Sequence, residues 1–153
     1  MRALKAILLG GAIAGACDIT YAITFWAFRG VAPTRVLLSV ASGLLGANAF
    51  KGGHGIAFLG LALHFLIALI WAALYILVAQ KIPLLTRRAF LCGLVYGAFI
   101  FAVMNLVVLP LSAFPRKVTF PFLATSTGLL VHIFLIGLPI ALAARKTRAE
   151  ADR

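Results

Sequence analysis

The sequence predicts an all-α membrane protein, a bundle of four transmembrane helices with one short interfacial or re-entrant helix on its outer side. Of its residues, 64% are apolar and 11% are charged, whereas soluble domains average roughly half and a quarter. The charged residues are gathered between long uncharged stretches, four of which can cross about 30 Å of hydrocarbon. These observations predict one compact membrane domain over residues 1–153.

Each long uncharged stretch defines one expected span. The spans cover residues 6–28, 55–79, 89–111 and 121–144, and only the first contains a formal charge, Asp18. Nine cations lie on the N-terminal side of the predicted membrane: Arg2, Lys5, Lys81, Arg87, Arg88, Arg145, Lys146, Arg148 and Arg153. Five lie on the other side: Arg29, Arg35, Lys51, Arg116 and Lys117. Because cytoplasmic loops carry the excess of Lys and Arg, this distribution predicts that both termini are cytoplasmic.

The segment 34–50, between the first two spans, has a different pattern. It has no charge after Arg35, and its apolar residues recur at helical spacing. Pro33 and Thr34 are typical of a helix start, and Gly52 and Gly53 of a helix stop. The segment is too short to span, so we predict a helix lying on the outer face or dipping into it. A fifth span is the competing interpretation, and only its length argues against it.

Composition also bears on partners. The net charge of +11 does not indicate nucleic-acid binding, because the Lys and Arg residues mark loops and chain ends instead of one folded face. The expected partner is the lipid bilayer, with a larger membrane complex or a homo-oligomer left open. Cys17 and Cys92 lie in different spans at different depths, so no disulfide between them is expected.

Strongly polar residues are few within the spans, and each is a candidate for function because burying it in lipid is costly. They are Asp18, His64, Asn105 and His132, one in each span. Counted from the outer ends of the spans, they lie about 9 to 17 Å deep. Small residues share their helical faces, which predicts that all four point toward neighbouring helices. The sequence therefore predicts a polar cluster in the outer half of the membrane, with secondary lining from Tyr21, Trp71, Tyr75 and Thr125.

A weak internal similarity accompanies this cluster. A glycine precedes His64 by four residues, at Gly60, and His132 by four residues, at Gly128. Two duplicated hairpins related by an axis along the membrane normal would give such a pattern. The match is short and of low complexity, so a coincidence explains it equally well.

Several functions are compatible with the cluster. We favour from the sequence a structural or accessory-subunit role, in which Asp18 bonds a histidine or Tyr21 and Asn105 bridges two helices. Interhelical hydrogen bonds of this kind contribute about 1 kcal/mol each. The first alternative is a proton-linked transporter or channel for a small molecule, because intramembrane ionisable residues mark transport pathways.

The second alternative is a b-type haem or a metal held by His64 and His132, with Asp18 as a third metal ligand. Two histidines are a weak signal, because transition metals usually take three or four ligands. An intramembrane enzyme is the least favoured class. Cys17 would be its nucleophile, but it points about 100° away from Asp18 around the helix.

Three stretches carry a resemblance to known proteins. They are Ser39-Val-Ala-Ser-Gly-Leu-Leu-Gly46, Met104-Asn-Leu-Val-Val-Leu-Pro-Leu-Ser-Ala-Phe-Pro115 and Gly137-Leu-Pro-Ile-Ala-Leu-Ala-Ala144. Through them the chain resembles, over nearly its whole length, a group of uncharacterised bacterial inner-membrane proteins. The resemblance implies four helices and a bacterial inner-membrane location, and it implies no activity.

Overall fold

The structure is a computed structural model that describes residues 2–151, and these residues are largely helical, with no strand among them. In chain order the elements are α1 (Arg2–Ala27), α2 (Pro33–Leu45), the 3₁₀ helix η1 (Gly46–Lys51), α3 (His54–Lys81), α4 (Leu84–Arg87), α5 (Ala89–Val103), the π-helical segment η2 (Met104–Val108), α6 (Leu109–Leu111), α7 (Phe122–Val131), the π-helical segment η3 (His132–Gly137) and α8 (Leu138–Ala151). Helices are expected here, because in lipid a helix satisfies every backbone donor and acceptor internally.

Four helices are long and apolar enough to cross a membrane: Arg2–Ala27, His54–Lys81, Ala89–Leu111 and Phe122–Arg148. They correspond to the four predicted spans and make the chain a multi-pass membrane protein. Three of them extend past the predicted limits into charged residues, at Arg2, at Lys81 and at Arg148. The sequence criterion ended each span where charge begins, but Arg and Lys are good helix formers and continue the helix beyond the apolar region.

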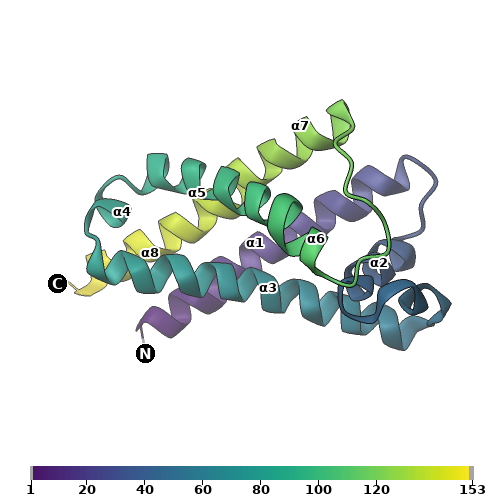
Figure 1. Cartoon of the computed structure of the whole chain (residues 1–153). Coiled ribbons are helices and arrows are strands. Elements are labelled where there is room, and N and C mark those ends of the chain that lie inside the picture. Colours follow the sequence, from purple (N-terminus) through teal and green to yellow (C-terminus); the bar gives the residue numbers. More distant parts are fainter. Residues whose placement is uncertain (1, 152–153) are drawn as a thin grey trace.

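The four long helices run side by side, and both ends of the chain lie at one end of the molecule, together with α4 (Figure 1). We call this the terminal end, and the opposite end, which carries α2, the α2 end. Helix α1 packs on α3 and α8, and α5 packs on η3 and α8. Gly11 and Gly15 of α1 face Leu69 and Phe65 of α3, so closely that a Cβ at either glycine would overlap α3.

The tightly packed core lies toward the terminal end. It consists mainly of alanine and isoleucine side chains, with Ile140 and Ala141 fully buried. Small side chains let helix backbones approach closely, which is how helices associate in lipid. Short side chains and close backbones therefore fill the contacts of α1, α3 and α5 with α8 in this half.

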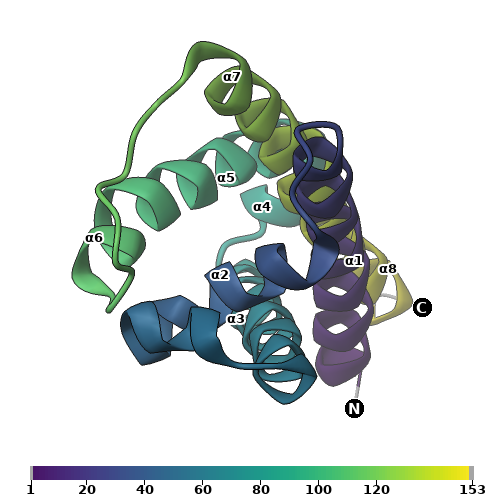
Figure 2. The same ribbon diagram turned by 90° about the vertical axis from the view of Figure 1, so that its right-hand side faces the viewer.

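Helix α2 lies at the α2 end beside α3, as Figure 2 shows from that side. Its 13 residues extend only about 20 Å, so it does not form the fifth span that was the competing interpretation of segment 34–50. Val36, Leu38, Ala41 and Ser42 form its buried face. At Gly60 of α3, an added Cβ would collide with the backbone carbonyl of Leu37. The helix therefore packs backbone to backbone on α3.

Each of the two π-helical segments is followed closely by a proline. Segment η2 ends two residues before Pro110, and η3 ends two residues before Pro139. Proline lacks an N–H group, and its ring clashes with the carbonyl four residues earlier. Widening the preceding turn relieves this clash, as the hydrogen bond from the N–H of Leu109 to the carbonyl of Met104 shows. Each of these two prolines is thus accommodated by a local π-helical turn.

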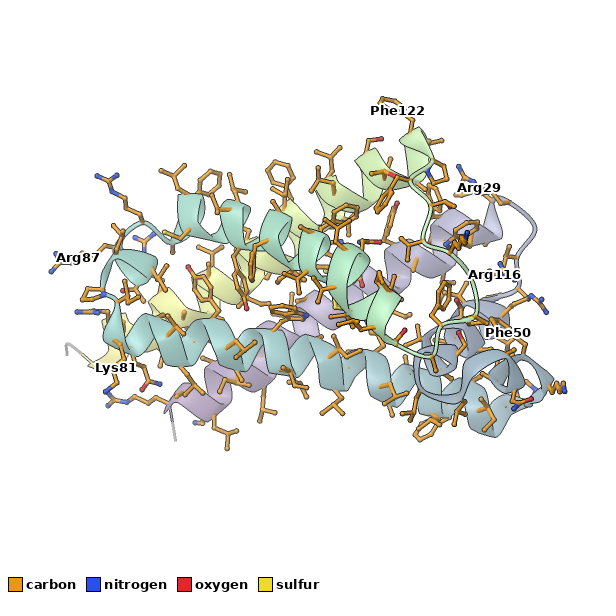
Figure 3. All side chains as sticks on the ribbon, viewed as in Figure 1. Arg29, Phe50, Lys81, Arg87, Arg116 and Phe122 are labelled. Atoms are coloured by element: carbon orange, nitrogen blue, oxygen red, sulfur yellow. The ribbon has the colours of Figure 1, made fainter. Side chains whose placement is uncertain are left out.

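The cations divide between the two ends of the molecule. Lys81 and Arg87 lie at the terminal end, whereas Arg29 and Arg116 lie at the α2 end (Figure 3). Arg153, which belongs to the predicted cytoplasmic set, lies outside the described residues. The flanks of the four apolar helices are therefore charged and their middles are not, apart from Asp18.

Candidate intramembrane binding site

A cavity of about 490 Å³ lies between the four long helices and α2. All four predicted polar residues line it: Asp18 from α1, His64 from α3, Asn105 from η2 and His132 from η3. Ser39 and Gly43 of α2 also contribute to its wall. The cavity has the size of an ordinary small-molecule site, and its wall combines apolar side chains with a few polar ones.

His64 links two helices. Its Nε2 donates a hydrogen bond of 2.9 Å to the carbonyl oxygen of Gly15 in α1. Because a carbonyl can only accept, the Nε2 atom carries the hydrogen, and the Nδ1 atom of the neutral ring is an acceptor. The bond requires α1 and α3 to be close, which the small size of Gly15 permits.

Asn105 and His132 bond only within their own helices. The Nδ2 atom of Asn105 donates to the carbonyl of Phe101 at 2.8 Å, and the Nδ1 atom of His132 donates to the carbonyl of Gly128 at 2.9 Å. The ring of Phe101 lies edge to face against His132, with centroids 5.2 Å apart. Both residues lie in π-helical segments, which occur frequently at functional sites.

Asp18 is the one acidic residue within the four apolar helices. Within residues 2–151 its carboxylate has neither a hydrogen bond nor an ion pair, and it is partly buried in the cavity wall. The Tyr21 hydroxyl, one expected partner, instead bonds the hydroxyl of Thr127 at 2.6 Å. Since Thr127 donates its own hydrogen to the carbonyl of Leu123, Tyr21 is the donor of that bond.

The structure places only one of the four predicted secondary lining residues in the cavity wall. Of the four, Trp71 lines the cavity, but Tyr21, Tyr75 and Thr125 do not. Tyr21 lines a groove on the outer side of α1 together with Cys17, and Tyr75 donates to the carbonyl of Leu85. Tyr75 and Thr125 lie two or three turns along the helix axis from the polar residue of their own span, whereas Tyr21 lies about one turn from Asp18 but faces Thr127.

A group of aromatic side chains, of which the sequence indicated Trp71 and Tyr75 but not Tyr96, limits the cavity toward the terminal end. The Tyr96 hydroxyl donates to the carbonyl of Trp71 at 2.7 Å and so joins α5 to α3. The rings of Tyr75 and Phe99 pack against Tyr96, with centroids 4.8 and 6.2 Å away. Nearer the terminal end, a second groove of about 640 Å³ runs between α3 and α5, and Trp71 lines both this groove and the cavity. Trp71 and Tyr96 therefore separate the polar cavity from an apolar groove.

The opposite boundary of the cavity is a contact between α2 and the end of the third span. The N–H of Ala113 donates to the carbonyl of Gly43 at 2.9 Å. Ser112 lines the cavity, and its hydroxyl donates to the carbonyl of Leu109. Sequence reasoning missed Ser112 and Tyr96, because serine and tyrosine are common in and around membrane spans and nothing in their spacing marks these two.

The candidate metal ligands do not form a ready metal centre. Within the described part of the chain, no group of three His, Cys, Asp or Glu side chains is arranged to hold a metal ion. The pair His64 and His132 as haem ligands stays a prediction, since each ring keeps one nitrogen without a partner in residues 2–151. Cys17 and Cys92 are free thiols.

The tyrosine bonds between helices give a first prediction. The changes Tyr21→Phe and Tyr96→Phe should each lower the free energy of unfolding by about 1 kcal/mol, since each removes one interhelical hydrogen bond. Because the two bonds join different helix pairs, the double variant should lose the sum of the two effects. Unfolding in mixed micelles of rising denaturing-detergent content measures these losses. Single variants as stable as the parent would contradict the assignment of these bonds.

The fold and the cavity together define a class: a multi-pass membrane protein with a mainly apolar cavity between its helices, to which each span contributes one strongly polar side chain. Comparison of the chain with models of protein families, with curated proteins and with solved structures finds no match. The function therefore has to be argued from the cavity itself.

Proposed function

We propose that the protein is a carrier that binds a small polar solute in the cavity and moves it across the membrane. The observation that supports this most is that one polar side chain from each span lines the cavity, while Asp18, Asn105 and His132 make no hydrogen bond to another helix. Buried polar groups that do not join helices are available to a ligand.

The same observation weighs against the structural role that the sequence favoured. If the polar residues only held the helices together, they would bond across helix interfaces. That task is carried out mainly by Tyr21, Tyr96 and His64. An accessory role in a larger complex would leave the cavity without a use.

A carrier must open its site to each side in turn, and two boundaries of the cavity are suited to this. On one side α2 covers the cavity through Ser39, Val40 and Gly43. On the other side, Trp71 and Tyr96 close the cavity, and they are joined by one hydrogen bond from the Tyr96 hydroxyl to the Trp71 carbonyl. The Trp71 and Tyr96 boundary depends on few contacts, so it can open at a small cost in free energy, whereas the α2 boundary opens by movement of this short helix as a whole.

We further propose that the membrane is the bacterial inner membrane, that both termini are cytoplasmic and that α2 is an outer, re-entrant helix. The distribution of cations between the terminal end and the α2 end supports this orientation. The resemblance to bacterial inner-membrane proteins supports the location. A homo-oligomer is compatible with the long apolar faces that α1, α3 and α5 expose.

The test fills the cavity and asks whether transport stops. Ile67 lines the cavity, whereas its neighbour Leu66 is 53% exposed and does not line it. Vesicles that contain the protein are incubated with a mixture of small amines, carboxylates, sugars and polyols, and the solutes retained inside are quantified by mass spectrometry. We expect at least one solute class to exceed its level in protein-free vesicles. This excess should fall at least tenfold in Ile67→Trp and persist in Leu66→Trp.

Two results would refute the carrier proposal. One is that no solute of any class is retained above the protein-free level, although circular dichroism shows folded protein in the vesicles. The other is that Ile67→Trp and Leu66→Trp retain equal amounts. Purification in a mild detergent adds a check, because a larger partner in fixed stoichiometry would favour the accessory role.

A further inference from the structure

The polar groups of the cavity are unevenly supplied with hydrogen-bond partners. His64 and His132 each use their N–H group on a backbone carbonyl, of Gly15 and Gly128. Asn105 uses one of its two N–H groups on the carbonyl of Phe101. These side chains therefore use their N–H groups on backbone carbonyls, and the atoms left without a partner are mainly hydrogen-bond acceptors.

The remaining acceptors outnumber the remaining donors. With both rings neutral, His64 keeps Nδ1 and His132 keeps Nε2, and Asn105 keeps its amide oxygen. Asp18 adds two carboxylate oxygens without a partner within residues 2–151. The free donors are the second N–H of Asn105, the hydroxyl of Ser39 and the indole N–H of Trp71, since the Ser112 hydroxyl is already committed to Leu109.

The charge of the cavity wall favours the same kind of ligand as this excess of acceptors. Asp18 is negative when ionised, and no lysine or arginine is among the residues that line the cavity. A charge in a low-dielectric site is stable only when it is paired. The described chain supplies no such counter-charge at Asp18, and a cationic ligand would supply it.

We infer that the cavity takes a small organic cation that carries N–H donors, such as a protonated amine. The inference rests on the proposed carrier function and names its substrate class. A primary ammonium group has one positive charge and three donors, and the Asp18 carboxylate in the wall offers it a counter-charge and two acceptor oxygens. The free ring nitrogens of His64 and His132 are further acceptors in the same wall for N–H groups of the ligand. The cavity volume of about 490 Å³ leaves room for an apolar chain beside the ammonium group.

The experiment compares four probes of similar size at one pH and one ionic strength. They are butylammonium, tetramethylammonium, butyrate and 1-butanol. The protein carries Trp26→Phe, because Trp26 does not line the cavity and its removal leaves Trp71 as the fluorescent reporter. Fluorescence titration in lipid nanodiscs, with protein-free nanodiscs as blanks, gives a dissociation constant for each probe.

We expect butylammonium to bind at least tenfold more tightly than each of the other three probes. The change Asp18→Asn should weaken that binding at least tenfold. The neighbouring change Cys17→Ser is the matched control, since Cys17 lies in the wall of a different groove, and it should leave the dissociation constant unchanged. Equal melting temperatures of the two variants would show that the loss is not unfolding.

Tighter binding of butyrate or 1-butanol, or binding of butylammonium that Asp18→Asn leaves intact, would overturn the inference. Equal binding of butylammonium and tetramethylammonium would overturn the requirement for N–H donors, and no binding of any probe would overturn the amine class. The carrier proposal is judged separately, because the vesicle experiment includes carboxylates, sugars and polyols and does not depend on the class of solute.

Discussion

Replacing Gly97 with alanine is expected to force α5 away from η3 and to cause one of the largest losses of stability that a single methyl group can produce in this protein. An added Cβ at Gly97 would overlap the backbone carbonyl of His132, and the Cα of Ile133 lies 2.6 Å from its position. From the other side, Gly137 meets the backbone of Gly97 and Gly93 in the same way. Neither backbone has a flexible group that can yield, so the two helices must separate.

The expected loss in the free energy of unfolding is about 3 kcal/mol, at the upper end for overpacking a close contact. It outweighs the gain of about 1 kcal/mol that alanine brings to a helix interior. Since His132 lies at the contact, its ring should also leave its place in the cavity wall. Unfolding in mixed micelles measures the loss.

The matched control for this change is Gly55→Ala. It is the same substitution in a helix, at a glycine whose added Cβ would meet nothing within 4 Å. It should leave stability unchanged or raise it by up to about 1 kcal/mol. If Gly97→Ala and Gly55→Ala are equally stable, the backbone contact between α5 and η3 is not as close as described.

Replacing Gly60 with alanine should release α2 from α3 without unfolding the bundle. The added Cβ would collide with the carbonyl of Leu37, and it would come within 3.3 Å of the backbone nitrogen of Ala41. Since α2 is a short helix that packs mainly on α3, it can move away more easily than a span can. Release of α2 would uncover the cavity at the α2 end.

Thiol labelling reports this release. Ser42 is fully buried on α2, and cysteine replaces serine with little change in size. In a protein with Cys17→Ala and Cys92→Ala, the introduced Ser42→Cys should react slowly with a maleimide. Adding Gly60→Ala should raise the rate at least tenfold, whereas adding Gly55→Ala should not change it. Equal rates in the two variants, both folded by circular dichroism, would exclude the tight packing of α2 on α3.

The spans could be predicted because each is a local property of the chain. Lipid requires every backbone group to be bonded within the segment, so a run of about 20 apolar residues suffices to define a helix. The four polar residues could also be placed at similar depths in the membrane, because a fixed rise of about 1.5 Å per residue converts position in a span into depth. Asp18, His64, Asn105 and His132 indeed line the same cavity.

The boundaries of the cavity could not be predicted in this way. The bond from Tyr96 to Trp71, and that from Ala113 to Gly43, join segments that are distant in the chain. No local rule states which helices become neighbours. The glycine pair Gly93 and Gly97 has the same spacing as Gly11 and Gly15, but the sequence alone did not single it out as the contact with η3.

Only the tertiary structure decided which polar atoms remain available. Sequence reasoning paired Asp18 with Tyr21 or a histidine, and Asn105 with a second helix. In the structure Tyr21 bonds Thr127, and Asn105 bonds its own helix. Depth and helical face follow from the regular geometry of a helix, which the sequence determines. Hydrogen-bond partners depend on how the helices are rotated and spaced against one another, and close contacts between distant glycine backbones fix that arrangement.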